Sequence, residues 1–207
     1  MFSHSAWLRK GRSDQRADIV VANVTITKGR LEIVDFIQPI AKDVREVLAT
    51  VPSAPAIKII EDLSGKELYV RGSSSYYEHM VTLNETFADR HLKAVALTAA
   101  DENLEDEDLL EMVNAGLLPF AVVNDHKAKI WARVFKSIKG RNDIYINDHG
   151  AIAAATRKGS PLLKTKIDSF IQEMTAKYGF QNQLRKRYYT DEKMIRRAYP
   201  ALLRLDR

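Results

Sequence analysis

Three consecutive serines form the first group of residues whose spacing could do chemistry. Ser73, Ser74 and Ser75 follow Gly72, between an expected strand and an expected helix. The first N–H groups of a helix have no acceptor within it, and together with serine hydroxyls they can bind an anion. Ordinary helix capping accounts for one serine. This stretch alone therefore leaves both a carboxylate or phosphate site and a simple cap open.

A second group combines an amide, hydroxyls and one arginine. Asn23, Thr25 and Thr27 end an apolar stretch, and Arg30 follows a few residues later. A guanidinium can hold a carboxylate through two parallel hydrogen bonds. By itself, this pattern does not establish a binding site.

Motifs of common enzyme classes are absent from the sequence. There is no G-x-S-x-G, P-loop, G-x-G-x-x-G or H-E-x-x-H pattern. The five histidines form no i, i+4 pair, and the chain has no cysteine. The acidic run 102–111 lacks the glycine-containing loop of a calcium site and fits the first turn of a helix. We therefore expect no catalytic residue, no metal site and no cofactor.

The composition is that of a globular chain. The 207 residues are 45% hydrophobic and 29% charged. Apolar runs such as 19–22 and 117–123 are too short to span a membrane, and residues 1–16 show no signal peptide. The tail 185–207 carries the net charge of +5, which fits a solvated linker or helix better than an anionic partner. No element that could read bases accompanies it, so we expect no nucleic acid.

Strands that alternate with helices must position the two polar groups. The pattern predicts an α/β fold with largely parallel sheets. Lys28–Arg30 is expected to be an interruption after a buried strand at Ile19–Ala22, and Asp125 is expected to cap a helix that carries Val134 and Phe135. Other strands are expected at 35–39, 67–71, 93–98, 117–123, 144–147 and 151–156, the last two around a turn at 148–150, and other helices at 76–87, 104–115 and 161–178.

Taken together and in order, these segments resemble the type 2 periplasmic solute-binding proteins. Ala17–Pro39 (ADIVVANVTITKGRLEIVDFIQP) is similar to the family signature A-D-x-x-x-A-x-x-T-I-T-x-x-R-x-x-x-V-D-F-x-x-P. Leu63–Ser75 (LSGKELYVRGSSS) is similar to the entry into the second lobe, and Ala115–Asp125 (AGLLPFAVVND) to the strand that ends in a ligand-binding aspartate. Within the family, residues 70–79 and 100–116 most resemble the non-catalytic domain of membrane-bound lytic murein transglycosylase F.

The resemblance implies two α/β lobes that are joined by crossover strands and hold a ligand between them. Thr25 and Arg30 would bind the α-carboxylate of a small zwitterion, with Asn23 belonging to the same strand end. Ser75 would add a backbone N–H, and Asp125 would pair with the ligand ammonium. The remaining residues would line the carboxylate edge, and they are Arg71, Ser73 and Ser74.

The resemblance also implies a division of the chain. Lobe 2 would span Ile57–Arg141, and lobe 1 would combine Ala17–Ala49 with Asn142–Tyr189. Residues 1–16 would be a basic N-terminal segment, and residues 190–207 a basic linker or helix. Because the family's opening strand and helix have no counterpart before residue 17, we expect lobe 1 to be incomplete and prone to self-association.

The implied function is non-catalytic binding in the periplasm of an amino acid or a cell-wall peptide fragment. Regulation of a peptidoglycan lytic transglycosylase, with a peripheral association with the outer membrane or cell wall, would follow from the closest resemblance. The alternative is a fragment of a catalytic lytic murein transglycosylase. That activity needs a general-acid glutamate in a lysozyme-like helical domain, for which no residues remain.

Overall fold

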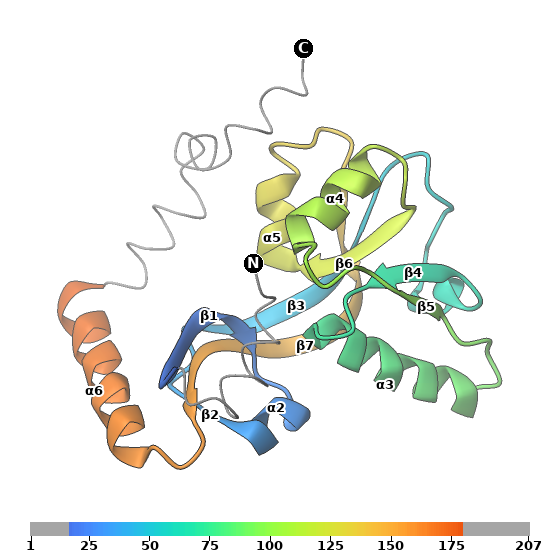
Figure 1. Cartoon of the computed structure of the whole chain (residues 1–207). Coiled ribbons are helices and arrows are strands. Elements are labelled where there is room, and N and C mark those ends of the chain that lie inside the picture. The colour runs from blue at the N-terminus through green and yellow to red at the C-terminus, as the bar shows by residue number, and fades with distance from the viewer. Residues whose placement is uncertain (1–16, 180–207) are drawn as a thin grey trace.

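The computed structural model describes residues 17–179 (Figure 1). The basic segments predicted at 1–16 and 190–207, and the charged tail from residue 185, lie outside the described residues. Two long strands, β3 (Ala41–Thr50) and β7 (Lys139–Arg157), run through the middle of the fold and pair with each other antiparallel.

The two ends of this strand pair carry different neighbours. β1 (Ile19–Thr25) and β2 (Val34–Phe36) pair with the second half of β7, whereas β6 (Phe120–Asn124) pairs with β3. The sheet order is β1-β7-β3-β6, with β2 also on β7. β3 and β7 thus connect two groups of elements, as crossover strands would. The lobe boundaries given above remain predictions.

The expectation of largely parallel sheets is wrong for this main sheet, in which every pairing is antiparallel. Parallel pairing occurs between β4 (Glu67–Val70) and β5 (Ala96–Ala99), which are joined by helix α3 (Ser75–Asp89). The expectation that two strands joined by a helix pair in parallel is confirmed for this strand–helix–strand unit. In the main sheet, β7 runs antiparallel to β3, and β1 and β2 run antiparallel to β7.

In the part of the chain that the structure describes, four further helices lie at the two ends of the fold. α2 (Lys28–Ile33) follows β1, and α6 (Pro161–Tyr178) packs beside β1 and β2. α4 (Asp106–Asn114) and α5 (Asp125–Trp131) flank β6 at the other end (Figure 1). A 3-10 turn at Ile60–Leu63 precedes β4. Among residues 17–179, no helix has the length and apolar character that a membrane crossing requires.

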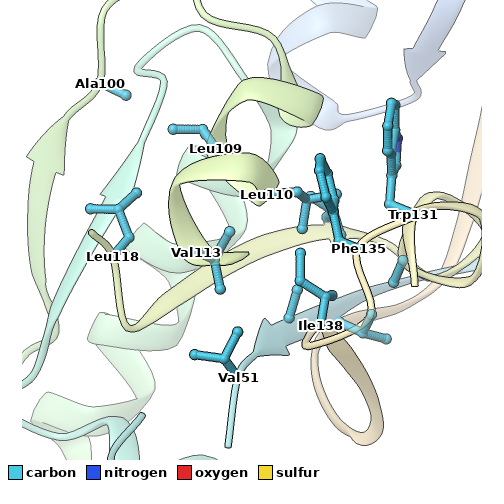
Figure 2. Close-up of a cluster of buried hydrophobic side chains, with 14 residues drawn as sticks. Val51, Ala100, Leu109, Leu110, Val113, Leu118, Trp131, Phe135 and Ile138 are labelled. Atoms are coloured by element: carbon cyan, nitrogen blue, oxygen red, sulfur yellow. The ribbon is translucent and has the colours of Figure 1, made fainter. Parts of the chain in front are cut away.

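The apolar core is divided into three clusters. One fills the space between α4, α5 and β6, where Leu110 and Val113 face Trp131 and Phe135 (Figure 2). The second packs α3 against β3, and the third, smaller cluster lies beneath α2, β2 and α6. The first two clusters support α3, α4 and the end of β6, and the third supports β1 and α2; the polar residues project from these elements.

Two local expectations near the start of the chain are corrected. Lys28–Arg30 is not an interruption: it forms the first turn of α2, which Thr27 caps by accepting a hydrogen bond from the Arg30 N–H. The strand at Ile19–Ala22 forms but is not buried, and Val21 is 81% exposed. Val20 and Ala22 pack against the third cluster, and Val21 is exposed because its side chain points to the other face of the strand.

The expected strands 144–147 and 151–156 are one continuous strand, β7, and no reversing turn separates them. The polar stretch Asp148–Gly150 lies within this strand, and His149 adopts a left-handed conformation there, with φ of 55°. Gly150 fits because a Cβ there would lie 2.7 Å from the Val44 carbonyl oxygen. The pairing with β3 shifts register in the same region.

The start and end of α5 also differ from expectation. Asn124 occupies the N-cap position, and Asp125 is the first helical residue instead of the cap. The helix ends at Trp131, so Val134 and Phe135 follow it. Phe135 still reaches the core, because its ring stacks on Trp131 with the ring centres 5.3 Å apart.

Candidate functional site

A cavity of about 400 Å³ lies where β1, α2, α3, α4 and α5 meet. Its size falls in the range of small-molecule sites, which is roughly 300–1,000 Å³. The lining combines three cationic and three acidic side chains with hydroxyls and amides: Asn23, Val24, Thr25, Arg30, Arg71, Ser73, Ser74, Ser75, Tyr76, Glu105, Asp106, Glu107, Asn124 and Lys127.

Arg30 extends from the first turn of α2 into this cavity. Its Nη1 donates to the Thr25 carbonyl oxygen at 2.9 Å, and its Nη2 donates to the Ser73 carbonyl oxygen at 3.0 Å. Nε lies 3.5 Å from the Glu78 carboxylate. Burial lowers the pKa of Arg30, an effect that Glu78 and Glu46 oppose, and the guanidinium stays charged. Each Nη carries two hydrogens, so one on each remains for a ligand.

The N-terminus of α3 lies beside Arg30. Ser74 is the N-cap, and its hydroxyl accepts from the Tyr77 N–H at 3.2 Å. The N–H groups of Ser75 and Tyr76 have no acceptor within the helix because they belong to its first turn. A guanidinium next to such N–H groups makes an electropositive corner that suits a carboxylate.

A cluster around the buried Asp106 carboxylate forms another part of the cavity wall. Asp106, 3% exposed, accepts from Arg71 Nη2 at 2.7 Å, Lys127 Nζ at 2.8 Å and Tyr76 Oη at 2.9 Å. Burial alone would raise the pKa of Asp106, but Lys127 and Arg71 hold it below its ordinary value. Burial would likewise lower the pKa of Lys127, but Asp106 and Glu107 raise it. The cluster therefore stays ionised, with its charges paired.

The same cluster connects to Asn124 at the end of β6. The Asn124 N–H donates to Tyr76 Oη at 3.2 Å, and burial together with Asp106 raises the pKa of that hydroxyl well above its ordinary value. The Asn124 side chain is buried at the cavity, and its Oδ1 has no partner among the described residues. Bonds from α3, α4, α5 and β6 thus converge on this wall.

The structure brings together seven of the eight predicted site residues. Those that line the cavity are Asn23, Thr25, Arg30, Arg71, Ser73, Ser74 and Ser75. Ser73 also uses its N–H and its hydroxyl to bind Glu102, and Ser74 donates to the Arg71 carbonyl oxygen at 2.7 Å.

Asp125 is the one predicted site residue that does not line the cavity. As the first residue of α5 it lies one position beyond the cavity wall, and Asn124 occupies the wall instead. The Asp125 carboxylate lies 3.9 Å from His126 Nδ1. Its predicted role with a ligand ammonium stays a prediction.

Residues that the sequence reasoning missed complete the site. Glu46 of β3 is 1% exposed, and its carboxylate lies beneath α3, within hydrogen-bond distance of Ser75 and His79. Asp106 was considered within the acidic run 102–111 and assigned to an ordinary helix start, and Lys127 was not singled out because a lone lysine carries no signal. Asn124 had one usable signal, its position directly after an apolar strand. Among residues 17–179, no group of three or more His, Asp or Glu is arranged to hold a metal ion.

Comparison with protein families gives one match over most of the chain. The model of the bacterial extracellular solute-binding proteins, family 3, matches residues 6–191. A search of the curated proteins found no match to the sequence.

Solved structures of binding proteins share the fold. One is the substrate-binding protein of an amino acid ABC transporter, at 23% identity and a TM-score of 0.72 over 89% of this chain and 76% of that chain. A lysine complex of an ABC transporter binding component from Wolinella succinogenes has 20% identity and a TM-score of 0.70 over 91% and 76%. A structure described for glutathione import in Streptococcus mutans has 17% identity and a TM-score of 0.74 over 91% and 78%. At these identities the similarity shows the fold.

Proposed function

The chain belongs to family 3 of the bacterial extracellular solute-binding proteins, and on this premise we propose that it binds a small amino acid through the α-carboxylate. The family is non-catalytic, so the chain is a binding protein and not an enzyme. The observation that carries the proposal is the position of Arg30. Its guanidinium, 11% exposed, lies on the cavity wall beside the first N–H groups of α3.

The carboxylate end of the ligand is the better supported end. Arg30 offers one free hydrogen on each Nη, and Ser75 and Tyr76 offer backbone N–H groups nearby. A carboxylate has about four acceptor positions, enough for this set of donors. Hydrogen bonds in which one partner is charged are stronger than those between neutral groups.

The ammonium end has three candidate partners. Glu105 and Glu107, at the start of α4, add carboxylates to the cavity wall. The resemblance favours Asp125, which follows Asn124 in the chain and lies one position beyond the wall. Asp106 is unsuited to this role because Arg71, Lys127 and Tyr76 already occupy its carboxylate.

The family premise and the neighbours support a role in uptake. Two of these structures belong to ABC transporter systems, and one of them is a lysine complex. We infer a periplasmic or extracellular location and a membrane permease as the partner. A cell-wall peptide also ends in a carboxylate and would suit the same corner. Our second proposal is therefore regulation of a lytic transglycosylase, which is supported by the resemblance of residues 70–79 to the non-catalytic domain of such an enzyme.

A thermal-shift screen of the twenty common L-amino acids and of a muropeptide tests the proposal. We expect at least one amino acid to raise the unfolding temperature, because a ligand that binds only the folded state stabilises it. A muropeptide that stabilises the protein more than every amino acid would favour the second proposal. If no compound in the screen raises the unfolding temperature, the proposed function is wrong.

A further inference from the structure

Glu46 is a buried acid in a row of otherwise apolar side chains. On the same face of β3, Leu48 packs against the apolar residues of α3, including Met80 and Phe87. A leucine at position 46 would extend that cluster. A buried carboxylate costs several kcal/mol of solvation unless its hydrogen bonds are complete, and an apolar side chain in its place is often at least as stable. Stability alone therefore does not explain this residue.

Each carboxylate oxygen of Glu46 has a partner, and both partners belong to the helix that carries the carboxylate corner. Oε1 accepts from Ser75 Oγ at 2.8 Å, and Oε2 lies 2.6 Å from His79 Nδ1. Ser75 and His79 are one turn apart on α3, so one carboxylate joins two successive turns to β3. The Glu46 backbone pairs with β6 on one side and β7 on the other, which makes it a firm attachment point.

This attachment decides what Ser75 presents to the cavity. Its hydroxyl is engaged on the buried side by Glu46, so the group left for a ligand is its backbone N–H. The Ser74 hydroxyl is engaged with the Tyr77 N–H. The corner consequently offers N–H donors beside Arg30.

We propose that Glu46, paired with His79, is a positioning residue for the carboxylate site: it fixes the first turn of α3 so that the Ser75 and Tyr76 N–H groups face the ligand. The proposal rests on the proposed function above and deepens it. Glu46 itself does not line the cavity and does not touch the ligand.

Glu46 also acts on the guanidinium that a ligand would meet. Burial lowers the pKa of Arg30, and the negative charge of Glu46 is one of those that oppose this effect. A glutamine at position 46 would keep hydrogen-bonding groups for α3 and remove the charge, so it separates the two effects.

The test compares Glu46→Ala and Glu46→Gln with a matched control, Glu85→Gln, which changes an exposed glutamate on the same helix. Calorimetric titrations use the amino acid that gives the largest thermal shift in the screen above. Glutamine keeps an acceptor for Ser75 and can donate to His79 Nδ1, so we expect an affinity loss below about threefold. For Glu46→Ala we expect the affinity for the amino acid to fall about tenfold or more, which corresponds to the loss of one charged hydrogen bond.

A second readout needs no ligand and separates this proposal from the proposed function. Backbone NMR signals of Ser75 to Tyr77 should shift in Glu46→Ala and stay in place in Glu85→Gln. If no amino acid binds but these signals shift, the proposed function fails and the positioning of α3 stands. Unchanged signals would overturn the proposal even if amino acids bind, and so would a Glu46→Ala protein that binds as tightly as Glu85→Gln.

Discussion

Arg30 Nη2 donates to the Ser73 carbonyl oxygen at 3.0 Å, although 43 residues separate the two in the chain. This hydrogen bond joins the first turn of α2 to the loop that leads into α3. Both partners line the cavity, so the guanidinium is held in place before any ligand arrives. A site of this kind needs little rearrangement on binding, which favours affinity.

Glu78 competes with a ligand for Arg30. Its carboxylate lies 3.5 Å from Arg30 Nε and is partly exposed. We expect Glu78→Gln to raise the affinity for an amino acid by about two- to fivefold, because an exposed ion pair is worth roughly 0.2–1 kcal/mol. Isothermal titration calorimetry measures this directly, with Glu85→Gln as control. A weaker affinity in Glu78→Gln would show that Glu78 helps to hold Arg30 in position instead.

The Asp106 cluster should make the fold sensitive to acid. The pKa of Asp106 is lowered in the folded state, so its stabilising effect is present above the unfolded value of about 3.9 and is lost as pH falls through the folded value. Urea unfolding at neutral pH should show a loss of about 3–5 kcal/mol in Asp106→Asn, since Arg71 and Lys127 lose their charged partner. The variant should also lose less stability than wild type below about pH 4. An identical acid response in both proteins would contradict this assignment.

The partner of the ligand ammonium can be identified by paired substitutions. The cavity wall predicts that Glu107→Gln weakens amino acid binding, whereas the resemblance predicts the same for Asp125→Asn. Truncating one partner of a buried charge pair costs about 2–5 kcal/mol, so the two alternatives separate clearly in a titration. If both variants bind the amino acid with wild-type affinity, neither Glu107 nor Asp125 pairs with the ligand ammonium.

The edge strand β1 should be less protected than β4. Val21 is largely exposed, whereas Leu68 and Val70 are buried. In a monomeric sample, we expect the amides of Ile19–Ala22 to exchange faster than those of Leu68–Val70, because protection follows local stability. Hydrogen exchange with mass spectrometry makes the comparison. Slow exchange at β1 only at high protein concentration would indicate that a second copy covers this edge, as the predicted self-association requires.

Much of the site could be predicted from local sequence patterns. The strand, small-residue turn and helix at 67–89 form as expected, and the serines cap and line the helix start. Arg30 was identified by its spacing from Thr25, although its helix was missed. These predictions succeeded because capping, turn chemistry and hydrophobic periodicity act over a few residues.

What could not be predicted depends on pairing between distant segments. The direction of β7 along β3 is set by contacts across roughly 100 residues, and no local pattern encodes it. For the same reason, the sequence pattern around Glu46 is that of a surface residue in a strand. Its contacts with Ser75 and His79 become visible only once α3 is packed on β3. Asp125 was placed at the site by the resemblance; it lies one position beyond the cavity wall, and its role stays a prediction.

The central claim is that Arg30 binds the carboxylate of an amino acid. Calorimetric titration of wild type, Arg30→Lys and Arg30→Ala with the best amino acid from the screen tests it most directly. We predict that alanine weakens binding by about 2–5 kcal/mol and lysine by less, because lysine keeps the charge but loses the two-pronged hydrogen bond. Equal affinity in wild type and Arg30→Ala would contradict the claim.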